Sequence, residues 1–350
     1  MQKLKIVGGI IFLMMLMQCA SSTSGVVIPT NQPFEKLSDY QFFTGNINQL
    51  QLHKDVLPYD LNSPLFSDYA EKARFVWMPK NTVAKYILDS VLDFPVGAVL
   101  GKTFFYYNNK TQPDLGKQLI ETRLLIKREK EWEAISYKWN EEQNEAYLDI
   151  VGEIKEVNWI DEKGIAQKVN YIIPNRNQCK SCHYQDGKLI PIGPKVRNLN
   201  KTFAYQDGEE NQLSKWSAKG MLTGWKSEEK HPKAVTWNDE HSGTLHHRAM
   251  SYLDINCGHC HNPQGPAHTS GLNLTYNEPM GRNLGIDKPP IAAGKGSGDR
   301  MFSIVKGHPE KSIMVYRMES TDPGAMMPEI GRQSVHHEGV ELIKEWITSL

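Results

Sequence analysis

Two copies of one short cysteine–histidine pattern constrain this chain more than any other feature. Four of the five cysteines fall within Cys179–His183 (CKSCH) and Cys257–His261 (CGHCH). The Cys-x-x-Cys-His spacing is the attachment signature of c-type haem, in which two thiols bind the porphyrin vinyl groups. Its three-residue step fits one helical turn, and the histidine that follows is placed to bind the iron. The predicted attachment points are Cys179, Cys182, Cys257 and Cys260, and the predicted proximal ligands are His183 and His261.

Other uses of paired cysteines fit this spacing less well. A zinc ribbon places its two pairs about 15–20 residues apart, whereas 74 residues separate Cys182 from Cys257. Zinc also gives no reason for a histidine after both pairs. A thioredoxin-like redox pair requires a strand–helix–strand context, which neither motif has. We therefore expect two covalently bound haem c groups as cofactors, with none of these four cysteines in a disulfide.

The N-terminus has the pattern of an export signal. Two lysines precede the apolar run Ile6–Met17, whose 12 residues are too few for a membrane-spanning helix of about 20 residues and fit a signal-peptide core. Cys19 follows as in bacterial lipoproteins, where the cysteine is lipidated. We expect a signal peptide over 1–18, lipidation at Cys19, and a tether over 19–34 that holds the protein in the periplasm or at the outer membrane. Ordinary cleavage beyond Cys19 would instead release a soluble protein.

Composition excludes two broad classes of protein. The chain has 40 Lys and Arg against 40 Asp and Glu, and this balance argues against nucleic acid as a partner, because phosphate-binding surfaces need excess positive charge. No second apolar run reaches membrane-spanning length, which excludes a polytopic membrane protein. The length of 350 residues allows two or three domains at about 100–200 residues each.

Residues 35–170 lack a haem motif and have the pattern of β-strands. Within 133–139, Ile135, Tyr137 and Trp139 alternate with polar residues and share one face. Turn-forming residues separate the candidate strands. This pattern predicts an antiparallel β sandwich or barrel-like domain. The expected strands are Arg74–Met78, Thr103–Tyr107, Thr122–Lys127, Glu133–Trp139, Ala146–Ile150, Val157–Ile160 and Val169–Ile173.

The remainder of the chain is predicted to form mainly α-helical cytochrome c-type haem modules. Residues 171–235 hold the first motif and a helix over 211–221, and are short for a complete cytochrome domain. Residues 236–350 resemble a class I cytochrome c domain, because a helical apolar pattern leads into Cys257 and an amphipathic helix ends the chain. The predicted fold class is therefore multidomain α+β. The C-terminal apolar stripe consists of Val340, Ile343, Trp346, Ile347 and Leu350.

Each haem also needs a distal ligand, for which thioether sulfur is common in electron-carrying cytochromes. For the second haem we expect Met327, because it precedes Pro328 in a loop before the last helix; Met326 and Met318 are the alternatives. For the first haem Met221 is one candidate, 38 residues after His183. The alternative is that this iron has no distal ligand and is five-coordinate. The other candidates are Met78, His241, His246 and His247. His259 and His268 are expected to be solvated or hydrogen-bonded to a propionate.

Four stretches of the chain resemble a family of exported dihaem c-type cytochromes, many of them from Gram-negative bacteria and largely of unassigned function. The resemblance spans about residues 55–350 and implies two haems on this architecture, without supplying a reaction. The stretches are Leu57–Ala70, Tyr171–His183, Ile192–Asn200 and Tyr252–Pro263.

Three functions fit these features. The favoured hypothesis is an electron carrier, not an enzyme, that passes single electrons between redox protein partners associated with the membrane. A peroxidase-like haem enzyme with one open iron site is the second. The third is an electron-accepting subunit for a partner enzyme bound to the β domain. The coordination of the two irons discriminates them, because a carrier needs both irons six-coordinate whereas a peroxidase needs one accessible iron.

Overall fold

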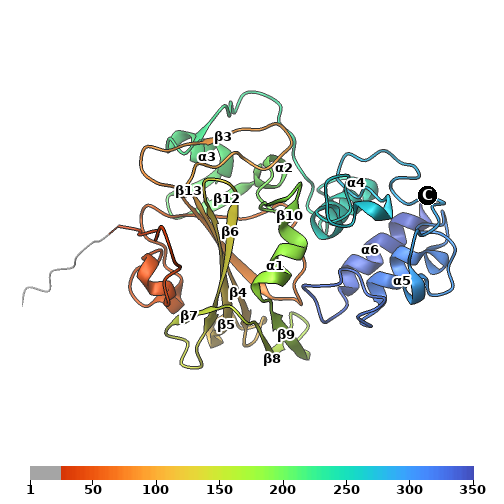
Figure 1. The fold of residues 1–350 in the computed structure, drawn as a ribbon, viewed down its shortest axis with the longest axis horizontal. Helices are drawn as coiled ribbons and strands as arrows, with labels where there is room; N and C mark the ends of the chain where they lie inside the picture. Colours follow the sequence, from red (N-terminus) through yellow and green to blue (C-terminus); the bar gives the residue numbers. More distant parts are fainter. Residues whose placement is uncertain (1–24) are drawn as a thin grey trace, which may run out of the picture.

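The computed structural model describes residues 25–350, so Cys19 and the expected signal peptide lie outside the described residues. Its main feature is a six-stranded antiparallel sheet with the order β1-β2-β4-β5-β6-β7. Helices follow toward the C-terminus, so the fold has mixed sheet and helix content (Figure 1). The strands are β1 Leu57–Tyr59, β2 Glu71–Trp77, β4 Val99–Tyr107, β5 Lys117–Lys127, β6 Trp132–Trp139 and β7 Ala146–Asp149. Among the described residues, no helix is both long and apolar enough to cross a membrane.

The seven strands expected from the sequence coincide with or overlap observed strands, with boundaries that differ by a few residues. The main sheet is open, because β1 and β7 are its unpaired edges. A separate hairpin of β8 (Glu153–Ile160) and β9 (Ala166–Ile173) packs against it. Phe104 and Tyr106 of β4 contact the hairpin through one buried aromatic cluster that includes Trp159. The expected sandwich or barrel is therefore an open sheet with a two-stranded hairpin on one face.

The two faces of the sheet have different partners. One face carries Ile135, Tyr137 and Trp139 of β6, which pack as predicted into a core with the N-terminal segment of the described chain. The other face packs against the hairpin and against α1 (Arg176–His183), which contacts β6. Alternation along the strands thus separates a closed core from a face that meets the first motif.

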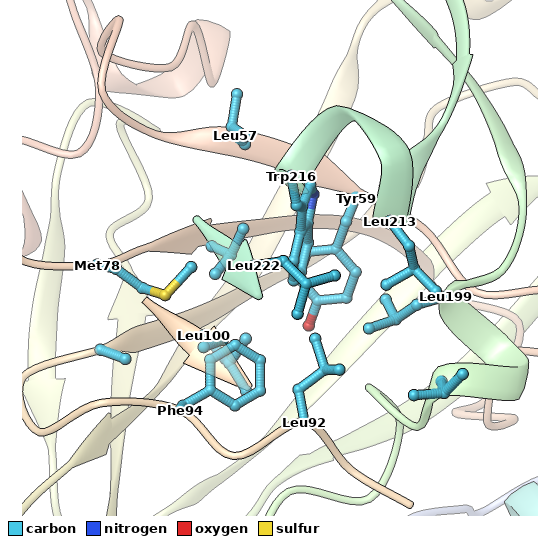
Figure 2. Packing of buried hydrophobic residues seen from close by; sticks show 14 of the residues in the cluster. Leu57, Tyr59, Met78, Leu92, Phe94, Leu100, Leu199, Leu213, Trp216 and Leu222 are labelled. Carbon is cyan, nitrogen blue, oxygen red and sulfur yellow. The ribbon is translucent and has the colours of Figure 1, made fainter. Parts of the chain in front are cut away.

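A third core joins β1, β2 and β4 to the segment after the first motif (Figure 2). Trp216 of α3 (Gln212–Ala218) lies at its centre and is 0% exposed. The helix expected over 211–221 is shorter, because Asn211 caps its start and the chain turns at Gly220, where φ is +69°. Short elements complete this region: β3 Ala84–Lys85, β10 Tyr184–Gln185, β11 Lys188–Leu189, α2 Val196–Leu199, β12 Thr202–Tyr205, β13 Gly208–Asn211 and β14 Leu222–Thr223.

The C-terminal part contains the two crossing helices that the sequence predicted. α4 (Leu245–Leu253) leads toward the second motif, α5 spans Ile313–Glu319, and α6 (His337–Thr348) carries the expected apolar stripe into a common core with α4. The helices approach closely at Gly339, where an added Cβ would lie 2.3 Å from the Tyr252 ring. These helices lie at the end of the molecule away from β7, with α1 between them and the sheet (Figure 1).

Candidate functional site

The first motif, Cys179–His183, lies on α1. A capping box begins this helix: Asn175 Oδ1 accepts from Gln178 N at 3.0 Å, and Asn175 N donates to Gln178 Oε1 at 2.9 Å. Cys179 and Cys182 therefore stand one helical turn apart on the same helix, which is the placement expected from their spacing. Neither thiol is in a disulfide.

The imidazole of His183 is held in the orientation that a metal ligand needs. Its Nδ1 lies 2.7 Å from the carbonyl oxygen of Ile190. A carbonyl only accepts, so Nδ1 carries the proton and Nε2 keeps its lone pair. Burial lowers the pKa of His183 to about 3, which keeps the ring neutral. Among the described residues, no hydrogen-bond partner is recorded for Nε2.

The second motif, Cys257–His261, continues from α4 through a π-helical turn at Asp254–Gly258. The Cys257 carbonyl accepts from the backbone N–H groups of Cys260 at 3.0 Å and His261 at 2.9 Å, which extends the helical winding to the histidine. His261 Nδ1 lies 3.0 Å from Ser270 Oγ, whose own proton is directed to a carbonyl 2.7 Å away. Nδ1 is therefore again the donor, and burial lowers the pKa of His261 to about 4. Both histidines thus have the same tautomer.

One cavity is lined by residues from both motifs. Its wall includes Cys179, Cys182 and His183 from the first motif and Cys257 and His259 from the second. The sheet forms another wall, with apolar side chains interspersed among charged ones. The cavity therefore lies where the sheet, α1 and the C-terminal helices meet.

The two motifs are in direct contact inside this region. Cys182 from the first motif and Cys260 from the second bring their sulfurs close together. Together with a ring nitrogen of His259, their sulfurs form a group whose ligand atoms all lie within 4.8 Å of one another. His259 has a buried Nδ1 with no protein hydrogen-bond partner among the described residues, so its expected bond to a propionate stays a prediction. A separation of 74 residues in the sequence gave no indication of this contact.

Of the expected distal ligands to the second haem, Met327 lines the cavity, as does Met318. Met326 is not in the cavity wall and is 3% exposed. The Met327 loop is held by Arg332, which is 4% exposed. The Arg332 guanidinium donates to the Met327 carbonyl at 2.9 and 3.1 Å. It also donates to the backbone carbonyls of Arg317, Ser320 and Ser334.

The structure does not bring Met221 to His183. Met221 follows α3 and packs against the core around Trp216, and it is absent from the cavity wall. Met78 packs into the same core. The alternative histidines His241, His246 and His247 do not line the cavity, and His268 is hydrogen-bonded to the Gly265 carbonyl at 3.0 Å. The chain after α3 turns into a hydrophobic core, so the structure does not place Met221 in the cavity that His183 lines, and its role as a distal ligand stays a prediction.

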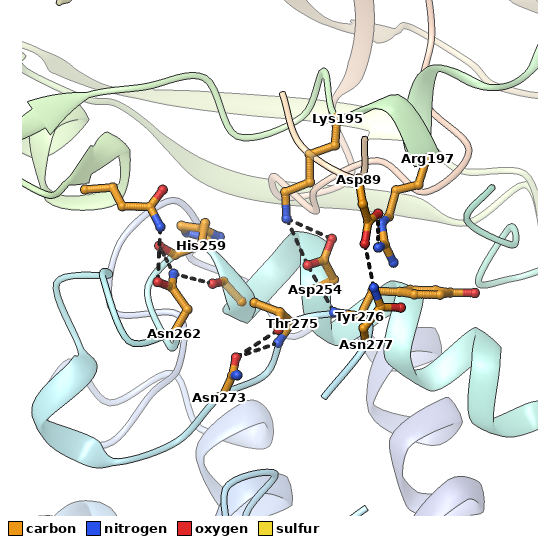
Figure 3. A network of polar contacts seen from close by, with 12 residues as sticks. Asp89, Lys195, Arg197, Asp254, His259, Asn262, Asn273, Thr275, Tyr276 and Asn277 are labelled. Carbon is orange, nitrogen blue, oxygen red and sulfur yellow. Dashed lines mark hydrogen bonds and ion pairs between the residues drawn. The ribbon is translucent and has the colours of Figure 1, made fainter. Parts of the chain in front are cut away.

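A polar network fixes the second motif against the segment that follows the first (Figure 3). Lys195 Nζ binds both carboxylate oxygens of Asp254, at 2.9 and 3.0 Å. Asp254 is the first residue of the π-helical turn that carries Cys257. Beside this pair, Arg197 forms an ion pair with Asp89 and stacks over the Tyr276 ring at 4.3 Å. The two motifs are thus held together by charge pairs as well as by their own contact.

Sequence reasoning missed the basic residues on the sheet wall of the cavity. Lys72, Arg74, Lys102 and Arg123 come from β2, β4 and β5 and line the same cavity as His183. Charged residues at alternating positions within otherwise buried strands were the available signal, since alternate positions share a face.

The chain was compared with known proteins in three ways. No family model matches it, and neither a curated protein nor a solved structure does.

Proposed function

We propose that this protein is a dihaem c-type cytochrome that relays single electrons between redox partners outside the cytoplasm. We also propose that it belongs to the exported dihaem family that its motifs resemble. The proximity of the two motifs carries the proposal: the sulfurs of Cys182 and Cys260, one attachment point from each motif, lie within 4.8 Å of each other. Haem groups attached at sulfurs this close together would be able to exchange electrons without an intervening protein segment.

The residues present fit two c-type haems. Cys179 and Cys182 would hold the first by thioether bonds, and Cys257 and Cys260 the second. Bound haem iron supplies one-electron chemistry by cycling between its ferrous and ferric states. The protein would contribute two proximal histidines, His183 and His261, each oriented by a hydrogen bond at Nδ1.

Met327 is the proposed distal ligand of the second haem. It lines the cavity beside Cys257, and the buried Arg332 guanidinium holds its carbonyl. Thioether ligation raises the reduction potential of a haem. Met327→Ala should therefore lower the potential of one haem and leave the other unchanged, and a redox titration that matches the parent protein would remove Met327 from this role.

Location and partners are proposed from the N-terminal sequence pattern. An exported lipoprotein attached at Cys19 would hold the haems close to the membrane, where protein electron donors and acceptors are present. The equal numbers of acidic and basic side chains fit such docking better than nucleic-acid binding.

Electron paramagnetic resonance of the ferric holoprotein, before and after hydrogen peroxide, tests the carrier against a peroxidase. Two low-spin signals that ignore peroxide support the carrier, because both irons are then six-coordinate. A high-spin signal that changes with peroxide supports an enzyme with an open iron site.

The cluster of Cys182, His259 and Cys260 supports one alternative occupant, a zinc ion. A structural zinc site uses four ligands, whereas this cluster has three, and it would leave His183, His261, Cys179 and Cys257 without a role. Metal analysis separates the cases: covalent haem gives iron in the protein after acid denaturation, whereas a zinc protein gives zinc and no absorbance from haem.

A further inference from the structure

Three cations lie side by side across the sheet wall of the cavity. In the strand register, Lys102 of β4 stands directly opposite Arg74 of β2 on one side and Arg123 of β5 on the other. Lys72 stands opposite Phe104, two residues along the same face. Like charges in directly opposed cross-strand positions repel each other and destabilise a sheet. The arrangement therefore needs negative charge close by.

The protein supplies part of that charge. Arg74 Nη1 lies 2.7 Å from Asp60 Oδ1, and Arg123 Nε lies 2.8 Å from Glu121 Oε2. Within the described part of the chain, no carboxylate is paired with Lys72 or with Lys102. Arg74 and Arg123 therefore each have a carboxylate partner, whereas the amino groups of Lys72 and Lys102 have none and are left uncompensated on this wall.

The two unpaired ammonium groups are placed around an aromatic ring instead. Lys102 Nζ lies 4.8 Å from the Phe104 ring centre, Lys72 Nζ lies 5.9 Å away, and the Arg123 guanidinium carbon lies 4.4 Å away. Lys72 also donates to the Ala70 carbonyl at 2.8 Å. Burial, with neighbouring cations as the next cause, lowers the pKa of Lys72 to about 7. An anion on this wall would oppose that shift.

The uncompensated charge and the first motif share one cavity. All four cations line it together with Cys179, Cys182 and His183. A haem attached through its vinyl groups keeps two propionate carboxylates at the other edge of the ring. Two carboxylates match the two uncompensated charges, and Arg and Lys are the side chains that bind carboxylates most strongly.

We propose that Lys72, Arg74, Lys102 and Arg123 form a site for a pair of carboxylates, and that its occupant is the propionate pair of the haem at the first motif. This inference rests on the proposed function. It gives the β sheet a role, because its cations would bind the propionates of the first haem and place positive charge close to that haem. The same chemistry would bind a free dicarboxylate, so the experiment includes that source.

Potentiometric titration of the holoprotein tests the site. Lys102→Gln and Lys72→Gln each remove one positive charge from the cavity wall. A cation near a haem favours its reduction, so each variant should lower the midpoint potential of one haem and leave the other unchanged. Lys138→Gln is the matched control: Lys138 is on the same face of the sheet, in β6, but it is paired with Glu153 at 2.6 Å and does not line the cavity. Its potentials should equal those of the parent protein.

Four outcomes decide the matter. A shift in one potential for both cavity variants, with none in the control, supports the site. Unchanged potentials in variants that contain two haems overturn it while leaving the dihaem proposal intact. Potentials that shift in the parent protein when succinate is added would assign the site to a free dicarboxylate. An altered spin state in Lys102→Gln would make Lys102 an iron ligand instead. A parent protein without haem refutes the proposed function itself, whatever these variants do.

Discussion

Asp68 joins the sheet side of the molecule to the loop that follows Met327, and its replacement by alanine should weaken that junction. Asp68 Oδ1 accepts hydrogen bonds from Gln333 N at 2.7 Å and from both N and Oγ of Ser334 at 2.8 Å. The side chain is 2% exposed, and its backbone is left-handed, with φ of 51°. Asp68→Ala removes this acceptor, and with it all three hydrogen bonds, and places a residue with a Cβ but no local polar group at a left-handed position.

The expected loss of stability follows from those contacts. Hydrogen bonds to a charged group contribute about 1.5–3 kcal/mol each, but the three share one oxygen and the carboxylate is costly to bury. The three lost hydrogen bonds should together cost about 3 kcal/mol of stability. Alanine in the left-handed region should cost about 1 kcal/mol more. Asp68→Ala should therefore lower the free energy of unfolding by about 4 kcal/mol, from these same two causes.

Asp68→Asn is the matched control, because asparagine keeps an acceptor at Oδ1 and tolerates a positive φ. Burial raises the pKa of Asp68 from its usual 3.8. A raised folded-state pKa means that the contribution of Asp68 to stability is greatest below pH 3.8 and declines as pH rises through the folded-state pKa. The neutral amide avoids this decline, so Asp68→Asn should cost less than about 1 kcal/mol at pH 7.

Guanidinium unfolding of the holoprotein, followed by tryptophan fluorescence and by haem absorbance, measures both variants. Asp68→Ala should unfold at a clearly lower denaturant concentration than Asp68→Asn. Equal midpoints for the two variants would refute it, because keeping the acceptor at Oδ1, and with it the three hydrogen bonds, would then add nothing to stability.

Three further predictions concern packing and the distal loop. Gly339→Ala gains about 1 kcal/mol of helix propensity but forces a methyl group into the aromatic ring of α4, so we expect a net loss of about 1–2 kcal/mol in denaturant unfolding; a stabilised variant would contradict the close crossing. Lys195→Met leaves the carboxylate of Asp254, whose side chain is 5% exposed, without its cation, and should lower the free energy of unfolding by about 3 kcal/mol. Asp254→Asn in the double variant should restore part of this loss. No such recovery would mean that the two side chains act independently. With Met327 as the proposed iron ligand, Arg332→Gln should weaken the ferric absorption band of the proposed sulfur–iron bond by loosening the loop; an unchanged band would show that the loop does not depend on this guanidinium.

The sequence predicted local structure well where the pattern was periodic. Alternation located the strands of the sheet, and the apolar stripe from Val340 to Leu350 predicted α6. Spacing within each motif also predicted a helical turn at Cys179 and Cys182, because three residues nearly complete one turn. These are short-range properties that neighbouring residues determine.

Long-range placement was not predictable from one chain. The proximity of Cys182 and Cys260 depends on how the C-terminal helices pack against α1, which no local pattern encodes. Met221 was expected near His183 from its distance along the chain, but Gly220 ends the helix and directs the methionine into a core. The cations on the sheet wall were overlooked because they come from three strands and become neighbours only through the register.

The mass of the exported, purified chain under denaturing conditions tests the central claim most directly, because covalent haem remains attached when the fold is lost. The account predicts a mass that exceeds that of the polypeptide with its proposed lipid at Cys19 by two haems, and by one haem when Cys179 and Cys182 are both replaced by alanine. A parent chain with no added haem, or one whose added mass does not depend on those two cysteines, would contradict it.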